Sequence, residues 1–291
     1  MQILLTGSTG LIGSALRTHW QGQHELHLID RQSGTRRWGS PLALEQLPAL
    51  DAVVHLAGAG IADKRWSEMR KRAILDSRIA TTRQLVNELL ALEHRPAVVF
   101  VASAIGYYGD RGNELLDEQS SNDVNFSSQL CQAWEACCAP LKEAGIRVVH
   151  LRFGIVLSAN GGALGKMLPA FKAGAGGRIG SGLQWMSWIA IDDVCAAIDF
   201  VLPRTEMSGA INLTSPNPVQ NRDFAKTLAK TLHRPCLLPM PAIAIKLLFG
   251  EMGEELLLGG ARVQPGVLQQ QGFEFQYPDL PQALQAYVGT K

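Results

Sequence analysis

An α/β fold is predicted by the sequence: a doubly wound parallel sheet of the Rossmann type with a smaller C-terminal α/β lobe for the substrate. Short apolar segments alternate with segments of helical periodicity through the first two hundred residues, and a glycine-rich turn follows the first apolar segment. Short, mostly apolar runs are typical of strands that helices cover on both faces. Their alternation with helices predicts parallel strands joined by right-handed crossovers.

The predicted elements of the sheet can be placed by residue number. Apolar residues recur at helical spacing from Leu11 to Trp20 and from Ile74 to Leu90, which predicts an amphipathic helix in each segment. The predicted strands are residues 3–6, 25–29, 51–56, 97–102 and 147–151.

The composition of the chain changes after Gly154. Residues 158–187 contain eight glycines and few strand signals, so we expect loops there that approach a ligand or other backbone closely. Prolines interrupt the chain from Pro235 onward, which predicts a small lobe beside the sheet. We expect a dinucleotide-binding domain at 1–155, completed by about 186–210, and a substrate lobe at 156–185 and 211–291.

The balance of charges limits the class of partner. The chain has 27 Lys and Arg against 26 Asp and Glu, a net charge of +1, which gives no electrostatic footprint for nucleic acid or a membrane surface. A small-molecule partner is therefore expected. The N-terminus carries no basic leader and no apolar stretch reaches the ~20 residues of a membrane span, so a cytoplasmic location is expected. Five cysteines without paired spacing indicate free thiols and no metal site.

The sharpest motif is the glycine-rich turn after the first strand. Gly7 permits a tight turn, Gly10 lets backbone approach a diphosphate, and Gly13 allows the following helix to pack closely on the strand. The start of that helix offers unpaired N–H groups and a partial positive charge to an anion. We therefore expect a dinucleotide diphosphate at this turn, held by residues Gly7, Ser8, Thr9, Gly10, Leu11, Ile12 and Gly13.

The end of the second strand bears on the choice of dinucleotide. Asp30 lies seventeen residues after Gly13, near the ~20-residue offset at which an acid binds the adenosine ribose and favours NAD(H). Arg31 favours the 2′-phosphate of NADP(H), because a guanidinium binds phosphate in a bidentate manner, and Arg36 and Arg37 add positive charge nearby. The local charge favours NADP(H) and leaves NAD(H) open.

Several further motifs carry a resemblance to a known family. Besides the glycine-rich turn, these are His55-Leu56-Ala57-Gly58, Ser103-Ala104-Ile105-Gly106-Tyr107-Tyr108-Gly109-Asp110, Leu151-Arg152-Phe153-Gly154, Gly180-Ser181-Gly182 and Trp188-Ile189-Ala190-Ile191-Asp192-Asp193. With them the chain resembles an extended short-chain dehydrogenase/reductase. Ala62-Asp63-Lys64-Arg65-Trp66, the segment 161–168 and Leu258-Gly259-Gly260 are typical of its "epimerase family protein" group, the nucleoside-diphosphate-sugar epimerases of bacteria and mitochondria.

This resemblance, which covers essentially the whole chain, implies positions for the site. Ser103 matches the serine of the catalytic set, and Tyr107 and Tyr108 match the tyrosine-glycine that follows it. Lys166 and Arg152 are candidates for substrate binding. Relatives of the wider family often form homodimers through helices near 67–92 and 127–144. The cofactor pocket implied is the glycine-rich turn together with Asp30, Arg31, Leu56, Ala57, Gly58, Arg78 and Ala102.

The chain departs from the family pattern at the catalytic pair. Active relatives carry Tyr-x-x-x-Lys on the helix after the serine strand, where the tyrosine is the acid/base and the lysine lowers its pKa. If Trp134-Glu135 marks the usual register, Ser127 and Cys131 occupy the two positions, and a shift of one residue places Phe126 and Leu130 there. Neither register supplies a phenol or an ammonium group.

Other residues are candidate substitutes for the missing pair. Tyr108 (or Tyr107) could reach the pocket, and Lys166 could meet an anionic substrate from the glycine-rich segment. We expect His55 to be a hydrogen-bonded core residue, and Asp192-Asp193 to cap the next helix without a catalytic role.

Two classes of function follow. The first is an NADP(H)-dependent epimerase or reductase, with a sugar nucleotide among the candidate substrates. The second, motivated by the missing pair, is an NADP(H)-sensing regulatory protein that has kept the fold.

Overall fold

A central six-stranded parallel sheet organises the molecule, as expected. The computed structural model describes residues 1–29 and 38–289. The strand order is β10-β6-β4-β3-β1-β2, and each neighbouring pair is parallel. The strands are β1 (Gln2–Thr6), β2 (Glu25–Ile29), β3 (Ala52–His55), β4 (Val98–Ala104), β6 (Arg147–Phe153) and β10 (Gly209–Leu213).

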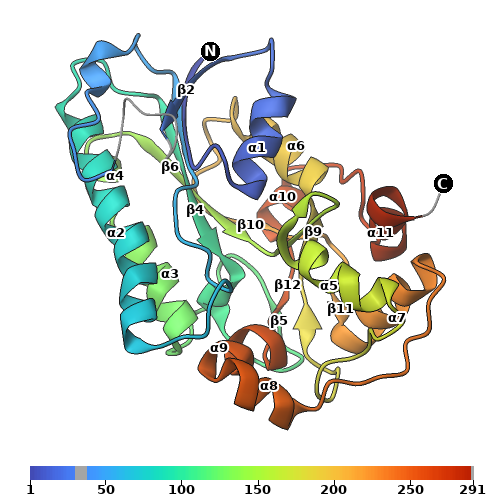
Figure 1. Ribbon diagram of the computed structural model, residues 1–291. Coiled ribbons are helices and arrows are strands. Elements are labelled where there is room, and N and C mark those ends of the chain that lie inside the picture. The colour runs from blue at the N-terminus through green and yellow to red at the C-terminus, as the bar shows by residue number, and fades with distance from the viewer. Residues whose placement is uncertain (30–37, 290–291) are drawn as a thin grey trace.

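Helices cover both faces of this sheet (Figure 1). On one face, Ile3 and Leu5 pack in a core with α1 (Leu11–His19), α6 (Ile191–Val201) and α10 (Gly266–Gln270). Leu4, which alternates with them along β1, packs on the other face. That second core is formed with α2 (Glu68–Ala91), α3 (Phe126–Ala136) and α4 (Ala139–Glu143). Because successive side chains of a strand point to opposite faces, one apolar strand contributes to both cores.

Local sequence signals explain where helices α2 and α3 begin. The side chain of Ser67 accepts a hydrogen bond from the backbone N–H of Arg70 and caps α2. Asn125 does the same for α3, by accepting from the N–H of Ser128 at 2.8 Å. Such caps satisfy N–H groups that have no partner within the helix.

A smaller lobe packs beside the carboxyl ends of the strands and has its own core, which includes Trp188, Phe224 and Leu284. Its strands form three short pairs, β7 with β9, β8 with β11, and β5 with β12. The elements outside the sheet layers are β5 (Leu115–Leu116), β7 (Ile155–Ser158), α5 (Gly162–Lys172), β8 (Trp185–Met186), β9 (Trp188–Ala190), β11 (Val219–Gln220), α7 (Asn221–Thr231), α8 (Ala242–Phe249), α9 (Glu251–Gly253), β12 (Arg262–Val263), α11 (Leu280–Val288), and short helical turns at Leu44–Gln46, Ile105–Tyr108 and Glu254–Leu258.

The structure differs from the sequence expectations in three places. The glycine-rich segment contains a regular helix, α5, whose Leu164 and Phe171 are buried in the core of the lobe. The sheet extends to Leu213 through β10, past the expected completion at about 210. The third difference concerns Asp193, which does not cap α6 but accepts hydrogen bonds from the backbone N–H groups of Gln276 and Tyr277. Asp193 therefore ties the C-terminal segment to the sheet domain.

Candidate functional site

The turn between β1 and α1 has the compact geometry that its glycines predict. Gly7 has φ +70°, and a Cβ there would lie 2.8 Å from the carbonyl carbon of Leu56. A Cβ on Gly13 would lie 2.2 Å from the carbonyl oxygen of Gly7. At Gly10 the same atom would meet, of the described residues, only that oxygen, at 3.3 Å. Among residues 1–29 and 38–289, no side chain caps the start of α1, and the N–H groups of a first helical turn suit an anionic ligand.

This turn lies where the strand order reverses. Strand β1 pairs with β2 on one side and with β3 on the other, so the loops that leave β1 and β3 diverge at the carboxyl edge of the sheet. In open α/β sheets ligands bind in the crevice at such a point. Of the other turn residues, Ser8 is buried and Thr9 is exposed, while Leu11 and Ile12, at the start of α1, are half-buried.

A buried hydrogen-bond chain supports the turn from behind. His55 Nδ1 lies 2.7 Å from Thr6 Oγ1, and its Nε2 lies 2.9 Å from Thr82 Oγ1. Trp134 donates its indole N–H to the same Thr82 hydroxyl. Burial lowers the pKa of His55 to about 3, so the ring is neutral at neutral pH. His55 is thus a satisfied core histidine, which confirms the sequence interpretation.

Arg78 brings a positive charge to the loop after β3. A Cβ on Gly58 would lie 3.3 Å from the guanidinium carbon of Arg78, so the guanidinium packs closely against this glycine. The guanidinium stacks 5.0 Å from the ring centre of Trp134 and donates to the carbonyl oxygen of Ile74. Burial lowers the pKa of Arg78 to about 10, which still leaves it charged at neutral pH. No carboxylate in the described ranges forms an ion pair with it, so its charge suits an anionic ligand.

Ser103, at the end of β4, is engaged by a buried carboxylate. Its hydroxyl donates to Glu135 Oε1 at 2.7 Å. Glu135 is held in turn by Arg152 of β6, through two N–H···O bonds of 2.9 Å. Burial raises the pKa of Glu135, but the hydrogen-bonded guanidinium outweighs it, so that the pKa is lowered and the carboxylate stays ionised. The hydroxyl proton of Ser103 therefore points toward Glu135.

Tyr108 belongs to the same network and lies in the interior. Its side chain is fully buried. The hydroxyl accepts from Arg152 at 2.9 Å and donates to Asn212 Oδ1 at 2.7 Å. Burial raises the pKa of Tyr108 to about 12. Tyr107 is half-buried, and the guanidinium of Arg152 lies 3.5 Å from its ring centre. Arg152 is thus enclosed between Glu135 and two tyrosines.

The register of α3 at the missing catalytic pair can now be read. Ser127 faces the residues that follow β4, because a Cβ added to Gly106 would lie 3.1 Å from the Cβ of Ser127. Cys131 faces the same way, since its Sγ lies 3.6 Å from the carbonyl oxygen of Ala104. Phe126 and Leu130 pack instead with Trp66 and Met252 in a separate apolar cluster. The first of the two registers is therefore the one that the structure has. Burial raises the pKa of the Cys131 thiol to about 11.

One residue at this site was missed in the sequence. Glu255, from the helical turn Glu254–Leu258 of the lobe, accepts a 2.6 Å hydrogen bond from Ser127 Oγ. It also accepts from the backbone N–H groups of Phe126 and Ser127, at 3.2 and 3.1 Å. A carboxylate from the lobe thus sits at the first turn of α3, where the helix dipole favours negative charge. A pattern of neighbouring residues cannot reveal a contact between two residues that are 128 positions apart in the sequence.

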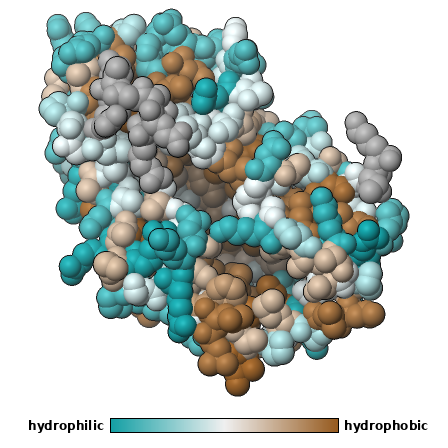
Figure 2. Space-filling view, viewed as in Figure 1, coloured by the Kyte–Doolittle hydropathy of each residue, from teal (hydrophilic) through white to brown (hydrophobic). Residues whose placement is uncertain are grey.

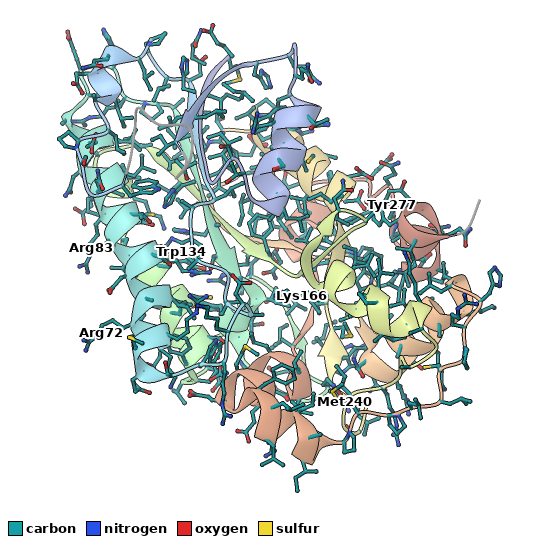
Figure 3. The ribbon with its side chains drawn as sticks, in the orientation of Figure 1. Arg72, Arg83, Trp134, Lys166, Met240 and Tyr277 are labelled. Carbon is teal, nitrogen blue, oxygen red and sulfur yellow. The ribbon has the colours of Figure 1, made fainter. Side chains whose placement is uncertain are left out.

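Lys166 of α5 reaches from the lobe to the sheet domain. Its Nζ donates to the carbonyl oxygen of Ala62 at 3.0 Å and lies 3.4 Å from Asp63 Oδ1. Figure 3 places Lys166 on the side of α5 that faces α2 and α3. Figure 2 shows a hollow between the lobe and the sheet domain, and side chains cross it. Lys166 is exposed, so it is accessible from this opening.

The remaining sequence candidates divide into two groups. Leu56 and Ala57 directly follow β3, and Ala102 lies in the last three residues of β4. Asp30, Arg31, Arg36 and Arg37 lie outside the described residues. All five cysteines are free thiols. Within residues 1–29 and 38–289, no group of acidic, histidine and cysteine side chains could hold a metal ion, and no helix is long and apolar enough to cross a membrane.

Comparisons with known proteins identify close relatives. The model of the NAD dependent epimerase/dehydratase family matches residues 3–213, and a domain of unknown function (DUF1731) matches residues 240–287. An epimerase family protein of Mycobacterium bovis is 38% identical, covering 99% of this chain and 98% of its own. One of Bacillus subtilis is 35% identical, covering 100% and 99%. The crystal structure of human epimerase family protein SDR39U1 (isoform 2) with NADPH is 33% identical, with a TM-score of 0.93 and 99% of each chain covered.

Proposed function

We propose, on the premise that this chain belongs to the NAD dependent epimerase/dehydratase family, that it is an NADP(H)-dependent enzyme. It would epimerise or reduce a small hydroxyl or carbonyl compound, and sugar nucleotides are the first substrate class to test. NAD(H) is the alternative cofactor against which binding should be compared.

The observation that carries this proposal is the fit of a diphosphate to the turn between β1 and α1. Gly10 leaves the approach to the uncapped start of α1 open, and Gly7 and Gly13 hold the loop in a shape that a Cβ would break. NADP(H) is preferred because the human relative was solved with NADPH. Arg78 would add a positive charge beside the loop after β3.

The residues near the end of β4 suggest how a substrate would be oriented. When bound, the cofactor would supply or accept a hydride. Ser103 donates its proton to Glu135, so it would receive a substrate hydroxyl as a hydrogen-bond acceptor. Tyr108 is buried and doubly hydrogen-bonded, so we assign it a positioning role through Arg152 rather than contact with substrate. Lys166, exposed at the opening, would attract an anionic group such as a substrate diphosphate.

Isotope transfer tests this function. NADPH carrying deuterium at both C4 positions is incubated with the purified chain and a panel of sugar nucleotides, ketones and aldehydes, and products are analysed by mass spectrometry. Because an epimerase starts from the oxidised cofactor and returns the hydride to the same substrate, the sugar nucleotides are also incubated with NADP⁺ and the formation of epimers is followed by NMR. We expect deuterium in at least one product, and a loss of about 10²-fold in its rate of formation in Ser103→Ala. Tight binding of the cofactor with neither deuterium transfer nor epimer formation for any member of the panel would count against an enzyme.

A second candidate function rests on the altered catalytic pair. Ser127 and Cys131 stand where relatives have tyrosine and lysine, and the pKa of Cys131 is raised by burial to about 11. A protein that kept the crevice without this acid/base could report the NADPH/NADP⁺ ratio to a partner. It must then bind the two forms with different affinities, since a ligand without preference shifts no equilibrium. Equal dissociation constants for NADPH and NADP⁺ would exclude this sensor.

A further inference from the structure

Exposed apolar side chains gather in one part of the C-terminal lobe. Among the described residues, six of the eleven large hydrophobic side chains that are exposed lie within residues 237–248. The most exposed are Leu237 at 77%, Leu247 at 71% and Ile243 at 69%. Figure 2 shows hydrophobic side chains gathered at the lower edge of the molecule, over α8. We call this group the apolar patch: Leu237, Leu238, Met240, Ile243, Leu247 and Leu248.

The apolar patch is part of the ordered fold. The backbone of Met240 donates to the carbonyl oxygen of Arg178 at 2.9 Å and accepts from the N–H of Gly180 at 2.8 Å. In α8, Ile245 is fully buried, while Ile243 and Leu247 are one turn apart and both face outward. The surfaces of monomeric proteins rarely expose contiguous apolar areas of this kind unless another surface covers them.

Positive charge lies next to the apolar patch. Arg178 and Arg222 are neighbours on either side of Gly182. A Cβ added to Gly182 would lie 3.1 Å from the Cβ of Arg178 and 2.9 Å from the Cβ of Arg222. Arg222, Lys226 and Lys230 follow one another at four-residue spacing along α7, and all are exposed. Residues 221–249 hold five Lys and Arg against one Asp, a net charge of +4, although the whole chain has only +1. The near-neutral balance of the chain conceals this local excess.

We propose that the apolar patch and the basic face of α7 dock on an anionic lipid bilayer. Apolar side chains that enter the headgroup region, flanked by Lys and Arg, are the features by which a peripheral protein binds such a surface. A second copy of the chain is a poorer occupant. In a two-fold contact the same patch meets itself, which would bring the basic faces of the two copies close together. The residues of the glycine-rich turn are not part of this surface.

Vesicle co-sedimentation of the full chain tests this docking. Vesicles of phosphatidylcholine alone are compared with vesicles that also contain phosphatidylglycerol, at low and high salt. The chain should partition preferentially to the anionic vesicles, and high salt should weaken the binding. In the double variant Ile243→Ser/Leu247→Ser we expect partition at least tenfold weaker. Met69→Ser is the matched control, because Met69 is 83% exposed on α2 and should not matter.

A charge variant supplies the second arm and does not depend on the apolar substitutions. Lys226→Gln/Lys230→Gln should bind anionic vesicles about tenfold more weakly. Arg17→Gln/Arg95→Gln, which also removes two exposed charges, should bind as the unaltered chain does. Equal binding to both vesicle types, or unchanged binding by either double variant, would overturn the proposal. So would a dimer in sedimentation velocity, without lipid, that Ile243→Ser/Leu247→Ser dissociates, because a second copy would then cover the patch.

Discussion

Single residues at the end of β4 show how a buried charge is compensated. Glu135 accepts from Ser103 and from two nitrogens of Arg152, and both partners of this ion pair are nearly buried. Removing one charge of such a pair leaves the other without compensation in a medium of low dielectric constant. The stability of the fold should therefore depend on Glu135 far more than on an exposed acid.

Glu135→Gln should lower the free energy of unfolding by about 3–5 kcal/mol, because Arg152 would stay buried without a counter-charge. Urea unfolding followed by circular dichroism measures this. The control is Glu114→Gln, whose partner Arg111 is on the surface, and its loss should stay below about 1 kcal/mol. Equal losses in the two variants would mean that the Glu135–Arg152 pair contributes no more than a surface pair.

At this scale the sequence predicts residue types better than it predicts their surroundings. The glycines of the turn and the core role of His55 could be inferred, because each depends on neighbours in one strand and its turn. The burial of Tyr108 could not, since Asn212 and Arg152 lie 104 and 44 residues away along the chain.

At the scale of elements, α3 is held at its start by a residue of the other lobe. Glu255 accepts from Phe126 and Ser127, in addition to the local cap from Asn125. This contact joins the lobe to the helix on which the catalytic pair of the wider family would lie.

Glu255→Ala should destabilise the chain by about 1–2 kcal/mol, because two N–H groups and one hydroxyl lose their acceptor near the positive end of the helix dipole. Thermal unfolding is a sufficient measurement. The neighbouring Glu254→Ala is the control, since Glu254 pairs with Lys246 where both side chains are about half exposed. A midpoint that falls as far in Glu254→Ala would show that this acceptor role is unimportant.

The strands were easier to predict than the lobe. Five predicted strands coincide with β1, β2, β3, β4 and β6 to within two residues at each end, because their apolar runs are short and bounded. The sequence does not predict helix α5, because its glycines and Pro169 disfavour a helix. The helix forms because Leu164 and Phe171 are buried by the rest of the lobe. Tertiary packing overrides local propensity there.

At the scale of the whole molecule, two buried histidines couple stability to pH. Burial lowers the pKa of His55 to about 3 and that of His150 to about 4. As the pH falls below about 6.5, the unfolded chain binds protons that the folded chain does not. Stability is therefore highest above pH 6.5 and is lost toward pH 4. Neither ring nitrogen of His150 has a hydrogen-bond partner among the described residues.

His150→Leu tests this coupling. Each histidine should contribute about 2 kcal/mol to the loss of unfolding free energy between pH 7 and pH 5. The variant should lose less stability over this interval than the unaltered chain, by about 2 kcal/mol, when denaturant unfolding is measured at both values. His94→Gln, at an exposed position, should leave the pH dependence unchanged. An undiminished pH dependence in His150→Leu would show that His150 already takes up its proton in the folded chain.

Calorimetric titration with NADPH tests the central claim, that the start of α1 holds the diphosphate of a nicotinamide dinucleotide. Within the described part of the chain a Cβ at Gly10 meets only one atom, at 3.3 Å, so Gly10→Ala should fold while it obstructs the ligand. Gly165→Ala, where a Cβ meets no atom within 4 Å, is the control. We expect binding by the unaltered chain and by Gly165→Ala, and affinity at least tenfold lower in Gly10→Ala. No binding to the unaltered chain at millimolar NADPH, or equal affinity in Gly10→Ala, would contradict the claim.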